Sequence, residues 1–74
     1  MNYLTFNYNP LWKLLIDKGI NRTELANEIG LARTTITKMG KNEYVAMEVL
    51  DRICNYLNCE ISDIVEHLKD KKED

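Results

Sequence analysis

Hydrogen-bonding side chains crowd one short stretch of the chain, residues 30–43, which reads GLARTTITKMGKNE. It contains one guanidinium, three hydroxyls and two ammonium groups, from Arg33, Thr34, Thr35, Thr37, Lys38 and Lys41. Such groups donate hydrogen bonds and carry positive charge, which suits non-covalent recognition of a polar partner. The single histidine, His67, has no nucleophile and base clustered with it, so the sequence predicts neither catalytic residues nor an enzyme.

Two apolar residues within this stretch indicate how the polar ones are held. Ile36 and Met39 are three residues apart, which places both on one face of a helix at about residues 33–39. That face is expected to pack on a core. The arginine, the threonines and the lysine then lie around the exposed sides of the same helix.

A second short helix is predicted immediately before the helix at residues 33–39. Asn21 is a suitable N-cap and Glu24 follows three residues later, the arrangement of a reciprocal capping box. The helix therefore spans about Arg22–Ile29 and ends at Gly30, which adopts a left-handed conformation without steric cost. Ala26 faces inward where the following helix must cross closely. The two helices are thus expected to meet through a tight turn.

Three further helices complete the predicted fold. Asn9 as N-cap and Pro10 at the first helical position begin a helix over residues 10–18. Apolar residues at helical spacing predict a fourth helix within residues 46–58 and a fifth over residues 61–68. Residues 69–74 are highly charged and are expected to be disordered. The prediction is one all-α domain, a five-helix bundle at residues 9–68.

The N-terminal residues 1–8 follow a different pattern. Apolar side chains alternate with others there, which is compatible with a short strand or an extended arm. No second strand is predicted downstream, so the segment is either a loose tail or pairs with its copy across a two-fold axis. The helix predicted over residues 10–18 is apolar nearly all round and needs additional cover from this arm, from the last helix or from a partner protomer. A homodimer interface is therefore predicted at Leu4, Phe6, Tyr8 and Trp12.

Charge is distributed unevenly along the 74 residues. The formal net charge is -2, yet residues 1–41 hold six positive and three negative side chains, and residues 42–74 hold four and nine. One basic face could therefore approach a polyanion while the rest of the surface stays acidic.

The two cysteines, Cys54 and Cys59, fit a reducing compartment, and a cytoplasmic location is expected because no secretory or membrane-spanning segment is evident. Cys54 falls on the apolar stripe of its helix and is expected to be a small core residue. A four-ligand zinc site would need a further ligand beyond the cysteines and His67, and no Cys-x-x-Cys pair is present. We therefore expect no metal, no cofactor and no evident small-molecule effector.

The spacing of the two central helices resembles the helix-turn-helix of the Cro/repressor-type (XRE-like) DNA-binding family. The resemblance covers about residues 9–68 and depends on Leu25, Ala26, Ile29, Gly30, Leu31, Ile36 and Met39 together. It implies a lambda-repressor-like five-helix bundle whose third helix enters the major groove of double-stranded DNA. The order of segments looks most like small stand-alone regulators, so the implied function is transcriptional regulation, with repression as the expected outcome.

The resemblance also implies a role for individual residues. The base-reading positions of the family fall on Arg33, Thr34, Thr37 and Lys38, and Arg33 is suited to a bidentate pair with guanine. Backbone phosphates are expected to be contacted by Thr35, Lys41 and Asn42. A further phosphate could meet the start of the second helix at Asn21, Arg22 and Thr23, where free N–H groups and the helix dipole are positive.

Two features depart from the family pattern. The residues at the starts of the third and fourth helices are Ala32 and Ala46, which cannot cap a helix with a side chain. The acidic second half of the chain weakens long-range attraction to DNA. An alternative therefore stays open, in which the same fold is a protein-binding module such as an antitoxin or a regulator of another repressor.

Overall fold

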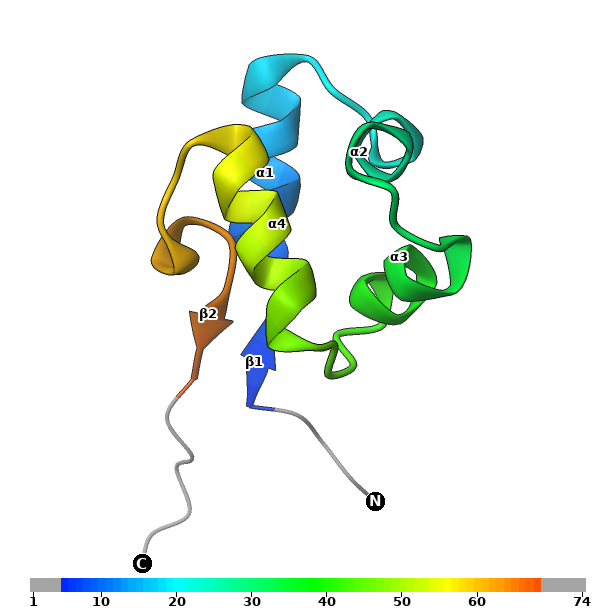
Figure 1. The fold of residues 1–74 in the computed structure, drawn as a ribbon. Helices are drawn as coiled ribbons and strands as arrows, with labels where there is room; N and C mark the ends of the chain where they lie inside the picture. Colours follow the sequence, from blue (N-terminus) through cyan, green and yellow to red (C-terminus); the bar gives the residue numbers. More distant parts are fainter. Residues whose placement is uncertain (1–4, 69–74) are drawn as a thin grey trace, which may run out of the picture.

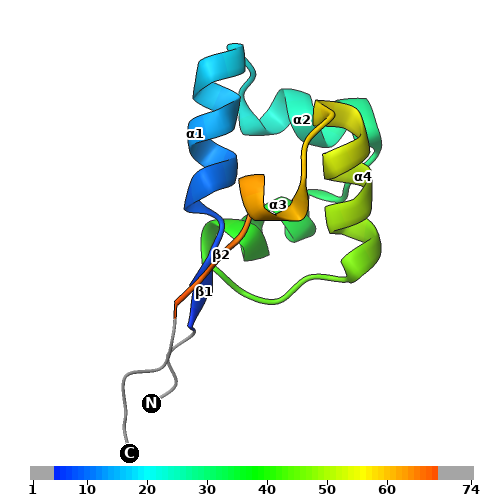
Figure 2. The same ribbon diagram turned by 90° about the vertical axis from the view of Figure 1, so that its left-hand side faces the viewer.

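The computed structural model describes residues 5–68. Four α-helices, one 3-10 helix and two short strands follow one another as β1 (Phe6–Asn7), α1 (Asn9–Lys18), α2 (Arg22–Ile29), α3 (Arg33–Gly40), α4 (Met47–Leu57), η1 (Ile61–Asp63) and β2 (Glu66–His67). Figures 1 and 2 show that the two strands lie together at one end of the helical domain. None of the described helices is long and apolar enough to cross a bilayer.

A single core unites these elements. Eight side chains form it, and every α-helix together with the segments before α1 and after η1 contributes: Tyr8, Leu11, Leu15, Leu25, Met39, Ile53, Leu57 and Ile64. The short helix α2 packs against α3 and α4, while η1 packs against α1 and α4. The helix-turn-helix pair is thereby fixed to the rest of the domain, because α2 and α3 each bury a residue that is 0% exposed, Leu25 and Met39.

The helix ends largely follow the sequence prediction. Gly19 and Gly30 terminate α1 and α2 in the left-handed conformation, with φ of 71° and 70°. The predicted N-cap of α1 was wrong by one residue, since Tyr8 occupies that position and its side chain makes no capping bond. The preceding Asn7 substitutes for it, because its Oδ1 accepts a hydrogen bond from the Asn9 N–H at 2.9 Å.

The predicted fifth helix is wrong, and so is the prediction that no second strand follows. Residues 61–63 form only one turn of 3-10 helix, after which β2 pairs antiparallel with β1, Phe6 opposite His67 and Asn7 opposite Glu66. Ile61, Ile64 and Val65 recur at helical spacing, but Ile64 alone is fully buried. A short apolar run does not distinguish a helix from an extended segment by periodicity.

The N-terminal strand is therefore held within its own chain. Tyr8 is 1% exposed and its hydroxyl donates a hydrogen bond to the Glu43 carbonyl oxygen at 2.8 Å. Phe6 stacks on Tyr44 with ring centroids 4.9 Å apart and meets Tyr8 edge-on. Tyr8 thus belongs to the core rather than to a surface that a second copy could reach. Leu4 and the predicted tail at residues 69–74 lie outside the described residues.

Candidate nucleic-acid interface

The helix α3 presents a polar face to solvent and an apolar face to the core. Met39 is 0% exposed and Ile36 is half-buried, as the spacing predicted. The four side chains assigned to base reading are all exposed: Arg33, Thr34, Thr37 and Lys38. At 100° per residue these positions span an arc of about 140°, opposite the buried side. The structure therefore brings them together on one surface.

The remaining α3 threonine differs from these four. Thr35 is half-buried, because its helical position falls between the polar arc and the core. Thr37 makes a local bond, in which its hydroxyl donates to the Arg33 carbonyl oxygen at 3.1 Å. That bond restrains the rotamer of Thr37.

The N-terminus of α3 lacks a side-chain cap, as predicted from Ala32. The Ala32 carbonyl oxygen accepts bonds from the N–H groups of Thr35 at 3.0 Å and Ile36 at 3.4 Å. In the described part of the chain, no backbone or side-chain acceptor meets the N–H groups of Arg33 and Thr34. These two donors and the positive end of the helix dipole therefore lie without a partner from residues 5–68 at the residue that carries the Arg33 side chain.

The N-terminus of α2 is closed by contrast. Asn21 Oδ1 accepts a hydrogen bond from the Glu24 N–H at 2.8 Å, and Glu24 Oε1 accepts one from the Asn21 N–H at 3.0 Å. The predicted capping box is confirmed. The capping box makes this end of α2 a poorer site for a phosphate, because the Glu24 carboxylate already accepts the Asn21 N–H and repels another anion. Thr23 stays exposed next to it.

Arg22 connects three elements and was not recognised in that role from the sequence. Its guanidinium carbon lies 3.7 Å from the centroid of a Trp12 ring, which places a cation over an aromatic face. A Cβ added to Gly40 would come within 3.1 Å of Arg22 Nη1, so the glycine leaves room for the guanidinium beside the end of α3. Trp12 is half-buried, and Arg22 covers one of its faces. The sequence prediction had sought part of this cover from a second protomer.

The loop after α3 holds one exposed cation and one structural amide. Lys41 is exposed, as a phosphate contact requires. Asn42 has a φ of 59° and its Oδ1 accepts a hydrogen bond from the Tyr8 N–H at 3.2 Å. The carbonyl side of this amide therefore ties the loop to the start of α1, and only its NH2 side is a donor for another partner. Asn and Gly tolerate a positive φ best, so the asparagine at position 42 was the signal in the sequence for this turn conformation.

Several apolar side chains remain on the surface away from α3. Ile16 and Met47 are 76% and 70% exposed, and Tyr44 is 70% exposed although it stacks on Phe6. The apolar first helix was predicted to need additional cover, and within the described residues its Ile16 has almost none. The C-terminal end of α1 and the start of α4 lie at opposite ends of the domain (Figure 1), so these side chains form two separate apolar surfaces.

Comparison with known proteins places this arrangement in a family. A family model described as a Cro/C1-type HTH DNA-binding domain matches residues 10–70. An uncharacterised HTH-type transcriptional regulator of Bacillus subtilis (strain 168), YozG, is 32% identical over 60 residues, covering 78% of this chain and 71% of its own. The crystal structure of the transcriptional regulator VanUg (Form II) is similar with a TM-score of 0.86 and 44% identity, covering 95% of this chain and 93% of that one.

The match of sequence and fold includes both helices of the central pair and the turn between them. The chain belongs to the Cro/C1-type helix-turn-helix DNA-binding family of transcriptional regulators.

Proposed function

We propose that this chain is a transcriptional repressor that reads a specific operator in double-stranded DNA with the exposed face of α3 in the major groove. The observation that carries the proposal is the division of α3 itself, with Met39 fully buried and Arg33, Thr34, Thr37 and Lys38 exposed on one arc. An α-helix of this width fits the major groove of B-form DNA. Binding there would block other proteins from the same site.

Base recognition is assigned to the four exposed side chains of α3. Arg33 lies in the first turn, where the helix approaches the base edges most closely in this family of folds. A bidentate pair of its guanidinium with guanine O6 and N7 would contribute about 1–3 kcal/mol of discrimination. The methyl groups of Thr34 and Thr37 suit the C5-methyl of thymine, and Lys38 reaches a neighbouring acceptor.

Phosphate contacts are assigned on both sides of α3. The unpaired N–H groups at the start of α3 offer one phosphate the donors that Ala32 does not satisfy. Lys41 and the Asn42 NH2 group lie after the helix, Thr35 lies on its flank, and Thr23 lies in the first turn of α2. Asn21 and Arg22 are the weaker members of the original set, because the capping box uses one and Trp12 stacks with the other.

A homodimer is part of the proposal, because a single α3 spans too few base pairs to specify a unique site. Two copies would place their recognition helices about 34 Å apart, one turn of DNA. The exposed side chains of Tyr44, Met47 and Ile61 near the two-stranded sheet provide apolar surface for such a contact. Sedimentation of the full chain and of Met47→Lys tests this part: a dimer that the lysine leaves unchanged would exclude this surface.

Removing residues 1–8 is a poor test of the dimer. That truncation deletes Tyr8, which is 1% exposed and bonded to Glu43, and it removes the partner of β2. The loss of structure would then be indistinguishable from the loss of an interface. A substitution at an exposed side chain avoids this ambiguity.

Selection of bound duplexes from a random library tests the DNA-reading proposal. The wild-type chain should enrich one sequence motif, and Arg33→Ala should lose preference at one base position of each half-site. Lys13→Ala is the matched control, because Lys13 is an exposed cation on α1 beside Ser62 and Glu66, away from α3. That control should enrich the wild-type motif; no enrichment by the wild-type chain would contradict the proposal.

A salt series separates DNA binding from the protein-binding alternative. Neutralised phosphates release counterions, so the logarithm of the binding constant should fall linearly with the logarithm of salt concentration, with a slope of about -0.9 per phosphate contacted. Lys41→Ala should reduce that slope by about one contact. A slope near zero would favour a regulator whose partner is a protein.

A further inference from the structure

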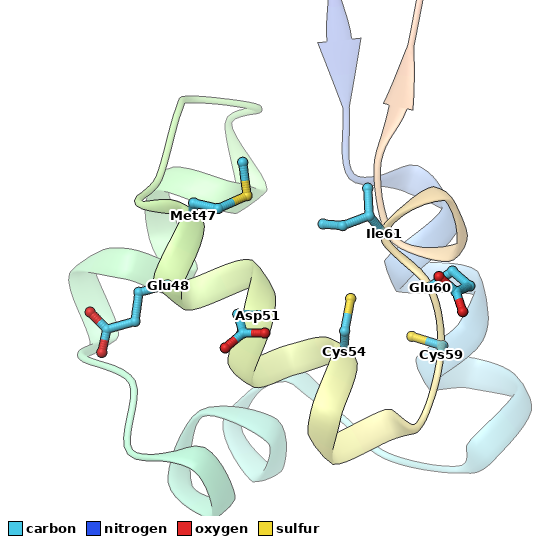
Figure 3. Close-up of a pocket in the computed structure, with 7 residues that line it drawn as sticks. All are labelled: Met47, Glu48, Asp51, Cys54, Cys59, Glu60 and Ile61. Carbon is cyan, nitrogen blue, oxygen red and sulfur yellow. The ribbon is translucent and has the colours of Figure 1, made fainter.

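The two cysteine side chains meet at the C-terminal end of α4. Cys54 lies in the last turn of that helix and Cys59 follows the helix end at Leu57. The chain reverses at Asn58, whose φ is 55°, and the Cys59 N–H donates to the Cys54 carbonyl oxygen at 3.0 Å. Figure 3 shows the two side chains next to each other, with the Cys59 sulfur directed toward the Cys54 side chain.

This thiol pair is reachable from solvent. Both residues are half-buried and both line a surface cavity of about 480 Å³. Figure 3 shows the rest of its lining, which comes from α4, from the residue before η1 and from the first residue of η1: Met47, Glu48, Asp51, Glu60 and Ile61. The cavity lies apart from the residues assigned to DNA, and Met47 and Ile61 on its wall also belong to the surface proposed for the homodimer.

The charges around the thiols are mainly negative. The carboxylates of Asp51, Glu60 and Asp63 all act electrostatically on the Cys54 thiol. Asp63 also acts on Cys59, and among residues 5–68 Lys18 acts on that thiol in the opposite direction. A negative potential of this kind disfavours an anionic ligand and favours a cation placed between the sulfurs.

The number of available ligands restricts which cation fits. Within residues 5–68, no group of three or more histidine, cysteine, aspartate or glutamate side chains is placed to hold a metal. Zinc in structural sites takes four ligands and calcium takes six or more, so neither suits a pair of thiols. Soft thiolate ligands select monovalent copper among the biological metals.

We propose that Cys54 and Cys59 bind one Cu(I) ion in two-coordinate geometry across the C-terminal end of α4. Binding displaces both thiol protons, so two thiols and one Cu⁺ give one dithiolate complex and two H⁺, with no change in oxidation state. The ion joins α4 to the segment that leads into η1. This assignment is compatible with the absence of a predicted zinc site, because it requires two ligands rather than four.

Competition for copper tests the assignment. The reduced full-length chain is titrated without oxygen into Cu(I) held as its coloured bicinchoninate complex, after a thiol assay has shown two free thiols per chain. The wild-type chain should remove one equivalent of Cu(I), and its Tm should rise when the ion is bound. Cys54→Ser and Cys59→Ser should each lose this equivalent, and Glu48→Gln should keep it as the matched control on the cavity wall.

Several outcomes would overturn the assignment. Failure of the wild-type chain to compete with bicinchoninate would mean that the thiols only pack against each other at the helix end. Full binding by either serine variant would exclude a two-thiol site. Half an equivalent bound by a copper-bridged dimer would exclude a site within one chain, and equal competition by Zn²⁺ would exclude two-coordinate selectivity. Alanine replaces serine at either position if circular dichroism shows that a serine variant is unfolded.

Discussion

The helices α2 and α3 have the same length, lie next to each other and differ most at their N-termini. The start of α2 is closed by its own residues, since Asn21 and Glu24 exchange two hydrogen bonds. The start of α3 follows Ala32, which provides no side-chain bond. Their exposed faces differ as well, because that of α2 carries Glu24 and Glu28 while that of α3 carries Arg33 and Lys38.

The difference indicates a division of roles between two otherwise similar helices. A self-capped helix with an acidic surface gains stability but has little to offer a phosphate. An uncapped helix with basic and hydroxyl side chains leaves its first N–H groups for a partner. We infer that α2 is the support and α3 the reader, with Leu25 and Met39 linking both to the core.

The largest effect is expected from removing the buried anchor of α3. Met39 is 0% exposed, so Met39→Ala should lower the free energy of unfolding by about 2–5 kcal/mol, because it leaves a cavity under the helix. Ile16→Ala is the matched control, since Ile16 is 76% exposed and outside the proposed dimer surface, and its truncation should change stability by less than about 0.5 kcal/mol. Urea unfolding followed by circular dichroism measures both; equal losses would mean that α3 does not depend on this anchor.

The cap of α2 comes next in size. Asn21→Ala should lower the free energy of unfolding by about 1 kcal/mol, because the N–H of Glu24 loses its acceptor. Asn27→Ala, an exposed asparagine within the same helix, makes no such bond and should change little. Thermal unfolding of the two variants side by side provides the measurement. A smaller loss at Asn21 than at Asn27 would show that the capping box is not what stabilises α2.

Giving α3 the cap that it lacks should separate stability from binding. Both Ala32→Ser and Ala32→Asp should raise the free energy of unfolding by about 0.5–1 kcal/mol, because each side chain accepts a bond from the free N–H groups. The aspartate should weaken DNA binding most, because it occupies the donors and also repels the phosphate, while the neutral serine should weaken it less. Electrophoretic shift at fixed salt compares them. Equal DNA affinity of the two variants would place the phosphate elsewhere.

A smaller effect is expected at alkaline pH from Cys59. Burial raises the pKa of its thiol from 9.0 to about 11, and the neighbouring Cys54 adds to the shift. Because the folded pKa lies above the unfolded one, the stability that Cys59 contributes is complete below pH 9 and is lost as the pH rises to about 11. Chemical unfolding between pH 8 and 11 should show a steeper decline for the wild-type chain than for Cys59→Ala. Parallel curves would contradict the shift.

The sequence was most informative where a structure is set by neighbouring residues. The capping box at Asn21, the ends of α1 and α2 at Gly19 and Gly30, and the missing cap at Ala32 all involve residues within a few positions of one another, and all were predicted. The four side chains on the open face of α3 followed from the spacing of Ile36 and Met39 in the same way.

The features that were missed depend on residues far apart in the chain. The sheet joins Phe6 to His67, and the Tyr8 hydroxyl meets Glu43 across 35 positions. The guanidinium of Arg22 lies between Trp12 and Gly40, which no local pattern could indicate. Ile64 fills the core from a 3-10 turn, where the periodicity predicted a longer helix. Each of these features is set by contacts between distant parts of the chain, which the local pattern does not contain.

The central claim is that Arg33 on α3 reads a base edge in the major groove. The most direct measurement replaces the guanine at the position that Arg33→Ala relaxes with 7-deazaguanine, which lacks the N7 acceptor but still pairs with cytosine. The wild-type chain should lose affinity equivalent to about 1–3 kcal/mol, and Arg33→Ala should bind the two duplexes equally. The same loss in both proteins, or none in the wild type, would contradict the claim.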